Sequence, residues 1–203
     1  MKNGVMDMPE NYCGYDVGEI KDILKIRLSK KRYVHSLDVA QTAEKLAERY
    51  NGDRERAYLA GLVHDICKEI PIGEQLEMAM ECGRDFSPAE QLIPPLYHSA
   101  AGAWYCENVL DIKDEDILNA VRYHTAARDG MSLLEEIIYI ADLTSEDRTY
   151  KDVGKMRRLS MENLQEAMLA ALSFSVRDVV GKNSLLPDNT VRAYNYYVSL
   201  LRG

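Results

Sequence analysis

The sequence lacks the features that would place the protein in a membrane or outside the cell. Its longest apolar runs stop well short of the roughly 20 residues that a spanning helix needs, and its first 16 residues contain no apolar signal core. The four cysteines are widely spaced and include no C-x-x-C pair, which is typical of reduced thiols and argues against a zinc or redox motif. We therefore expect a soluble, cytoplasmic protein with no membrane partner.

An excess of positive charge is also absent. The formal net charge is -8 at pH 7. Nucleic acids and anionic membranes bind electropositive surfaces, so we expect no nucleic-acid partner. Any anionic substrate must be held by local cations, because the overall field would repel it.

The chain shows no period-2 strand pattern, no internal repeat and no low-complexity linker. Apolar residues recur instead at helical spacing along most of its length. With 203 residues, 46% of them hydrophobic, the chain can bury the core of one ordinary domain. We predict an all-α fold, a helical bundle in which residues 16–203 form a single domain and residues 1–15 form a flexible leader.

Capping residues and helix breakers place the helices along the chain. Asp16 and Asp53 are expected N-caps, and the segments that begin at Ser87 and Ser132 each have the spacing of a capping box. After residue 142, a polar connection that carries Arg148 is expected to lead to a long helix. The expected helices cover residues 16–29, 30–50, 53–65, 72–81, 87–93, 98–110, 113–124, 132–142, 161–180 and 187–201.

Six residues that can bind metals stand in five different expected helices. A buried histidine next to a buried aspartate is costly unless both are hydrogen-bonded, paired or coordinated to a metal. A single His-Asp pair is weak evidence by itself, because about 0.3 such pairs are expected by chance in this sequence. Its meaning depends on the order His, His-Asp, His, His, Asp across helices that a bundle can bring together. The residues are His35, His64, Asp65, His98, His124 and Asp142.

Imidazole and carboxylate ligands without thiolate suit iron, manganese, cobalt, nickel or zinc at an open, catalytic site. Such a metal lowers the pKa of bound water. A resemblance to a known family, described after these residues, implies that the water attacks a phosphate, whose phosphoryl oxygen the metal polarises. Two cations are expected to flank it, because residues three and four apart share a helix face: Arg32 precedes His35 by one turn, and Lys68 follows the His-Asp pair by one turn. Arg148 could close over phosphate as a bidentate fork.

The roles of His98 and His124 stay open at this point. They could hydrogen-bond phosphate oxygens, protonate a leaving phosphate or bind a second metal ion. The residues expected to take part in catalysis are Asp65, Lys68, His98 and His124. Those expected to bind the substrate are Arg32, Lys68, His98, His124 and Arg148.

The order of these residues resembles the HD-domain superfamily of metal-dependent phosphohydrolases. The resemblance extends from about residue 16 to residue 200. It implies an HD-domain helical bundle in which the metal is bound by four ligands, His35, His64, Asp65 and Asp142.

Within that superfamily, four segments are similar to the YqeK-type bacterial proteins: KRYVHS at 31–36, GLVHDICK at 61–68, YIAD at 139–142 and PDNTVRAYN at 187–195. The resemblance implies an iron centre and a nucleotide substrate. It also implies cleavage of diadenosine tetraphosphate at its middle bridge into two nucleoside diphosphates. After the last ligand, this family commonly has Asp-x-Ile-Glu-Pro-Asn-Arg, where the present chain has DLTSEDR at 142–148. We therefore expect the loop over the nucleotide, and with it the substrate preference, to differ most.

Other branches of the superfamily fit less well. Alarmone hydrolases carry a Glu-Asp pair soon after their His-Asp, and cyclic dinucleotide phosphodiesterases carry a Gly-Tyr-Pro motif; this sequence has neither. A nucleotidase acting on mononucleotides remains open. So does a nucleotide-sensing HD module without catalysis, although such modules usually lose metal ligands that this chain keeps. A homodimer is also left open.

Overall fold

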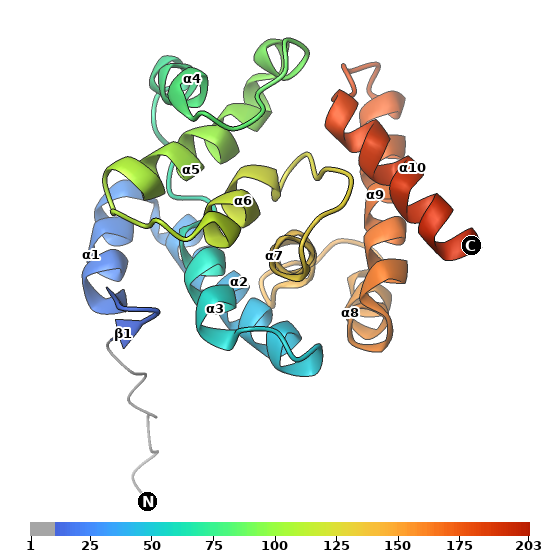
Figure 1. The fold of residues 1–203 in the computed structure, drawn as a ribbon, viewed down its shortest axis with the longest axis horizontal. Coiled ribbons are helices and arrows are strands. Elements are labelled where there is room, and N and C mark those ends of the chain that lie inside the picture. The colour runs from blue at the N-terminus through green and yellow to red at the C-terminus, as the bar shows by residue number, and fades with distance from the viewer. Residues whose placement is uncertain (1–10) are drawn as a thin grey trace, which may run out of the picture.

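The computed structural model describes residues 11–203, and helices dominate it (Figure 1). This part of the chain contains ten α-helices, two short 3-10 turns and one small antiparallel hairpin. The expected all-α fold is therefore confirmed. The elements are β1 (Asn11–Tyr12), β2 (Tyr15–Asp16), α1 (Val17–Arg27), α2 (Lys30–Arg49), α3 (Arg54–Val63), α4 (Ile72–Glu81), η1 (Glu90–Leu92), η2 (Pro94–Leu96), α5 (Tyr97–Asn108), α6 (Glu115–Tyr123), α7 (Leu133–Thr144), α8 (Val153–Glu162), α9 (Leu164–Gly181) and α10 (Asp188–Arg202).

Three expected helix starts form as the sequence predicts. The side chain of Asp16 accepts a hydrogen bond from the backbone of Glu19, and Asp53 caps α3 in the same way. Ser132 and Glu135 form the reciprocal bonds of a capping box at the start of α7. Each cap satisfies backbone N–H groups that a helix start otherwise leaves unpaired.

Two expected helices are wrong in extent. The predicted helix 161–180 is interrupted at Asn163, whose extended backbone ends α8 and whose side chain caps α9; α8 occupies part of what was expected to be a polar connection. The Ser87 capping box does form, with Ser87 N donating to Glu90 Oε2 at 2.9 Å. Only the 3-10 turn η1 follows it, and it ends before Ile93, whose ψ of 79° is not helical; a residue before proline is disfavoured in the α conformation.

The expected leader falls only partly within the described residues, since residues 1–10 lie outside them. The hairpin β1–β2 begins at Asn11, and Tyr12 is buried with its ring 4.7 Å from that of Tyr58 in α3. Within the expected leader, residues 11–15 therefore form a hairpin that packs on α3 through Tyr12, and the division of the chain at residue 15 stays a prediction. Burial of one aromatic side chain gives the hairpin a fixed position.

The helix α7 occupies the centre of the fold (Figure 1). Helices α1 to α6 lie on one side of it, and α8 to α10 lie on the other. Its residues from Leu134 to Ala141 are all buried. Among the described residues, no helix combines the length and the apolar character needed to cross a membrane.

The close approach of α2 and α3 depends on Gly61. A Cβ atom at this position would lie 2.8 Å from the Cα of Ala40, a distance that backbone atoms cannot accommodate. Glycine therefore allows the two helices to pack backbone to backbone. This contact brings the part of α2 that carries His35 towards the end of α3, where His64 follows.

Candidate metal centre and phosphate cavity

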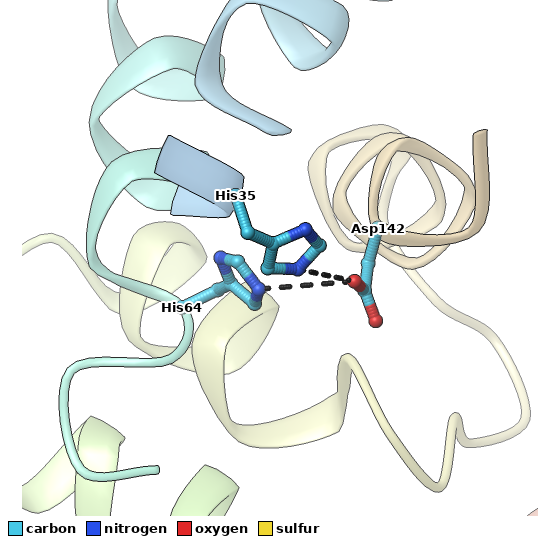
Figure 2. Close-up of side chains that lie close together, drawn as sticks. All are labelled: His35, His64 and Asp142. Atoms are coloured by element: carbon cyan, nitrogen blue, oxygen red, sulfur yellow. Dashed lines mark ion pairs between the residues drawn. The ribbon is translucent and has the colours of Figure 1, made fainter. Parts of the chain in front are cut away.

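Three helices bring the expected ligands together. His35 lies in the second turn of α2, His64 directly follows α3, and Asp142 lies in the last turn of α7. Both imidazole rings point towards the same carboxylate (Figure 2): Asp142 Oδ1 lies 3.0 Å from His35 Nε2 and 3.9 Å from His64 Nε2. The α3 helix ends two residues earlier than expected, so the His-Asp pair stands in the turn that follows it.

The Asp65 carboxylate completes the set. Its Oδ2 lies 3.4 Å from His64 Nε2 and 3.9 Å from His35 Nε2. Two overlapping groups of side chains are compact enough to hold an ion: His35, His64 and Asp142 form one, and His64, Asp65 and His124 form the other. All four expected ligands therefore surround one small region at the end of the α2–α3–α7 contact.

Three histidines have their rings fixed through Nδ1. This atom lies 2.7 Å from the carbonyl of Gly61 in His64, 2.7 Å from that of Val121 in His124, and 2.9 Å from Asp147 Oδ2 in His35. A carbonyl or carboxylate oxygen only accepts, so Nδ1 carries the proton in each ring. The Nε2 lone pairs are then free to bind a metal, which is the usual arrangement of metal-binding histidines.

Two buried polar atoms of the cluster without hydrogen-bond partners among the described residues indicate whether its side chains fit a metal ion. His64 Nε2 and Asp65 Oδ1 form no hydrogen bond of acceptable geometry with any described residue. Buried polar atoms without partners are rare because each costs free energy. A cation between them would satisfy both, so the donor set fits a divalent metal ion.

The two carboxylates are held in the ionised form that binds metals. Burial opposes ionisation of Asp142, but its interactions with His35, His64 and Arg148 hold its pKa well below the usual range. Burial likewise opposes ionisation of Asp65, yet contacts with His64 and His124 keep its pKa low. Metal binding needs deprotonated ligands, so no proton has to leave these carboxylates at neutral pH.

The pKa values of His64 and His124 are shifted in opposite directions by their surroundings. Burial lowers the pKa of His124, which favours the neutral ring. Burial also acts to lower the pKa of His64, but the carboxylates of Asp65 and Asp142 outweigh it and raise the value. A buried cluster that attracts a proton in this way also attracts a metal cation.

His98 and His124 meet on the other side of Asp65. Their Nε2 atoms are 3.2 Å apart and lie 3.3 and 3.6 Å from Asp65 Oδ1. Lys68 Nζ lies 3.1 Å from His98 Nε2, and burial together with the charge of Lys68 lowers the pKa of His98 well below its usual value. This geometry is compatible with a second ion and with a phosphate oxygen, so both roles of the histidine pair stay open.

The two expected phosphate-binding arginines contact the ligand carboxylates directly. Arg32 Nη1 lies 2.8 Å from Asp65 Oδ2. Arg148 bonds the Asp142 carboxylate through Nη2 and donates from Nε to its backbone carbonyl at 2.7 Å. Both line a cavity of about 310 Å³ beside the cluster, whose other lining residues are Lys31, His35, Asp147, Thr149 and Tyr150. Three cations thus face one cavity next to the candidate metal ligands.

The sequence did not identify Asp147 or Arg157 as part of the site. Asp147 lies in the segment 143–148 that departs from the family pattern, and this departure was its only signal. Arg157 of α8 donates from Nε to Thr144 O at 2.9 Å and from Nη2 to Ser145 O at 2.6 Å and Arg148 O at 3.0 Å. It fixes the backbone of the loop that carries Asp147 and Arg148. No motif could reveal it, because its partners are main-chain carbonyls.

The HD domain family profile matches residues 32–147, which span the whole ligand cluster from His35 to Asp142. The chain belongs to the HD domain family. The match includes Arg32, Lys68 and both remaining histidines but ends one residue before Arg148.

Curated relatives of this HD domain resemble it over nearly their whole length. A Bacillus subtilis protein named symmetrical bis(5'-nucleosyl)-tetraphosphatase is 35% identical, with 87% of this chain and 94% of that protein covered. A Staphylococcus aureus protein of the same name is 33% identical, with 90% and 94% covered. A solved structure from Clostridium acetobutylicum, described as an HD superfamily hydrolase involved in NAD metabolism, is 40% identical with a TM-score of 0.87 and covers 90% of this chain and 97% of its own.

Proposed function

We propose that this HD-domain protein is a metal-dependent hydrolase that cleaves dinucleoside tetraphosphates, diadenosine tetraphosphate among them, into two nucleoside diphosphates. The observation that carries the proposal is the convergence of the Nε2 atoms of His35 and His64 on the carboxylates of Asp65 and Asp142. The cationic cavity beside them suits a chain of phosphates. The similarity to proteins named symmetrical tetraphosphatases supports the choice of substrate.

We propose iron as the metal. The ligand set of imidazole and carboxylate also suits manganese, cobalt, nickel and zinc. His35, His64, Asp65 and Asp142 would hold the ion. When bound, it supplies a nucleophilic hydroxide and polarises a phosphoryl oxygen.

The cations of the site would bind and orient the phosphates. Arg32 and Arg148 each have donors that can move from a ligand carboxylate to a phosphate oxygen, and the planar guanidinium suits two-point contact. Lys68 stands beside His98 and Asp65, and burial lowers its pKa towards the range in which an ammonium can give up a proton. Lys68 would then protonate the leaving phosphate, and the neutral rings of His98 and His124 would hydrogen-bond phosphate oxygens or bind a second ion.

Product identity tests the proposal. The protein purified with its native metal should convert diadenosine tetraphosphate to ADP alone, as resolved by anion-exchange chromatography. AMP together with ATP would contradict cleavage at the middle bridge. Turnover of mononucleotides without turnover of diadenosine tetraphosphate would indicate a nucleotidase, and no turnover with any of the five metals would indicate a sensing module.

Two variants connect the activity to the metal centre. Asp142→Ala should lose metal, measured by elemental analysis, and lose turnover by at least about a thousandfold, while its circular dichroism spectrum stays unchanged. Asp22→Ala removes a carboxylate that is exposed on α1 and should change neither property. Full metal content in Asp142→Ala would refute the ligand assignment.

The cytoplasmic location and the homodimer stay predictions. All four cysteines are free, and Cys67, Cys82 and Cys106 are buried, which is compatible with a reducing compartment. Cell fractionation and sedimentation equilibrium would test the two predictions separately.

A further inference from the structure

A second cavity of about 400 Å³ lies beyond the phosphate cavity, between α8 and α9. Its walls are largely apolar and include Leu143, Met156, Leu159 and Phe174. Pockets of this size and character hold small organic groups whose surface is mainly apolar. The metal centre and its cations do not account for this cavity.

Tyr150 joins the two cavities. This residue lines both of them, and it follows Arg148 by only two residues. Leu143, in the apolar wall, directly follows the candidate ligand Asp142. A molecule whose phosphates contact Arg148 can therefore extend past Tyr150 and place its next group in the apolar cavity.

Two aromatic rings give this cavity a flat surface. The rings of Tyr150 and Phe174 are stacked, with centroids 5.9 Å apart and planes inclined by 23°. Phe174 is 50% exposed, whereas large apolar side chains of this kind are usually buried. An exposed aromatic ring that lines a cavity offers a stacking face to a planar ligand.

The rim of the cavity carries more positive than negative charge. Lys151, Lys155 and Arg177 contribute cations, and Asp152 is the only acid in the lining. Asp152 is paired with Lys155 at 2.9 Å, which leaves two cations. On a chain of net charge -8 this local excess suits a planar apolar group that is attached to phosphates.

We propose that the cavity between α8 and α9 binds the purine base of the nucleoside diphosphate whose phosphates occupy the neighbouring cavity. It holds one half of a dinucleotide substrate, and the same half as product after cleavage. The assignment rests on the proposed function for the choice of nucleotide. The assignment goes beyond the proposed function because it names Phe174 and Tyr150 as the residues that hold the base.

The contribution of the base to affinity can be distinguished from that of the phosphates by comparing two ligands of the metal-loaded protein. Isothermal titration calorimetry would compare ADP with pyrophosphate, which lacks the base and the ribose. Phe174→Ala should weaken ADP binding by about 5- to 100-fold, the loss expected for one base stacked on an aromatic ring. Its pyrophosphate binding should stay within twofold of the wild type.

Two further variants test whether weaker binding in Phe174→Ala could come from a general disruption of the structure. Ala170→Leu fills the cavity without removing the aromatic pair and should weaken ADP binding while sparing pyrophosphate. Tyr196→Ala removes an aromatic ring of comparable exposure from α10, outside the cavity lining, and should bind both ligands as the wild type does. Thermal melts would show that all three variants are folded.

The outcomes separate this proposal from the proposed function. Unchanged ADP binding in Phe174→Ala, an equal loss for ADP and pyrophosphate, or no ADP binding by the wild type would overturn the base site. ADP binding that depends on Phe174, in a protein that leaves diadenosine tetraphosphate intact, would uphold the base site and overturn the proposed hydrolysis.

Discussion

The His35 ring is held from both sides, by Asp147 at Nδ1 and by Asp142 at Nε2. The two distances are 2.9 and 3.0 Å. Burial opposes ionisation of Asp147, but the hydroxyl of Ser145 and the contact with His35 lower its pKa, so this carboxylate is charged at neutral pH. An ionised carboxylate on Nδ1–H fixes the ring orientation and makes Nε2 a better metal ligand. Asp147 therefore acts on the candidate metal centre without belonging to it.

Replacing Asp147 should weaken metal binding. Asp147→Ala removes the acceptor of His35 Nδ1, and we expect the metal affinity to fall by about 10- to 100-fold. Asp147→Asn keeps an acceptor oxygen and should lose less. Competition with a chelator of known affinity measures the change, and Glu146→Ala, at the exposed neighbouring position, serves as the control. Equal affinities in Asp147→Ala and the wild type would exclude this role.

Arg157 should control the loop without affecting the metal. Arg157→Ala removes the donors to Thr144 O, Ser145 O and Arg148 O, so we expect kcat/KM for the nucleotide to fall by about tenfold or more. Metal content should stay full, and backbone hydrogen exchange at residues 145–149 should become faster. The adjacent Arg158 is exposed, and Arg158→Ala should leave kinetics and exchange unchanged. A loss of metal in Arg157→Ala would contradict the assignment.

The ion pair between Arg122 and Glu90 should stabilise the fold only while both partners are present. Both side chains are fully buried, with Arg122 Nη2 2.8 Å from Glu90 Oε1. Arg122→Met leaves the Glu90 charge buried alone and should lower the free energy of unfolding by about 3 to 5 kcal/mol. The double variant with Glu90→Leu should lose less, because no unpaired charge remains.

Urea denaturation measures this effect. Lys25→Ala, which breaks an exposed pair with Asp22, should leave the midpoint unchanged. A double variant less stable than Arg122→Met would show that the polar contacts of Glu90 outweigh the cost of burying its charge.

The contact between Glu136 and Tyr197 should make stability fall as the pH rises. Burial raises the pKa of Glu136 above its ordinary value of 4.5, although the hydrogen bond from Tyr197 Oη, at 2.5 Å, opposes the shift. The folded protein then binds this proton more tightly than the unfolded chain does. The resulting stabilisation is complete below the unfolded pKa and is lost as the pH rises through the folded one.

The variant Glu136→Gln isolates this group. The wild type should lose stability relative to Glu136→Gln as the pH rises from the ordinary glutamate value of 4.5 towards neutral pH, as followed by denaturation at each pH. Glu81→Gln, at an exposed position on α4, should show no such trend. A difference between the wild type and Glu136→Gln that stays constant over this range would refute the raised pKa.

Local chemistry made much of the fold predictable. A cap such as Asp53 acts on a backbone group three residues away, so the sequence alone determines where α3 begins. Apolar periodicity identified most helices for the same reason. It missed α8, because this helix is mostly polar and depends on packing of its few apolar residues, such as Met156 and Leu159, on the core.

The candidate site likewise has a part that the sequence predicts and a part that only the structure shows. The sequence by itself determined the identity and order of the metal-binding side chains, since His35, the His64-Asp65 pair and Asp142 keep a recognisable spelling and stand near helix ends. Only the tertiary structure decided that Asp147 reaches His35 across 112 residues and that Arg157 holds the backbone of the loop. It also decided that Tyr150 lines two neighbouring cavities. These contacts depend on how helices pack, and packing joins residues whose separation along the chain leaves no pattern to read.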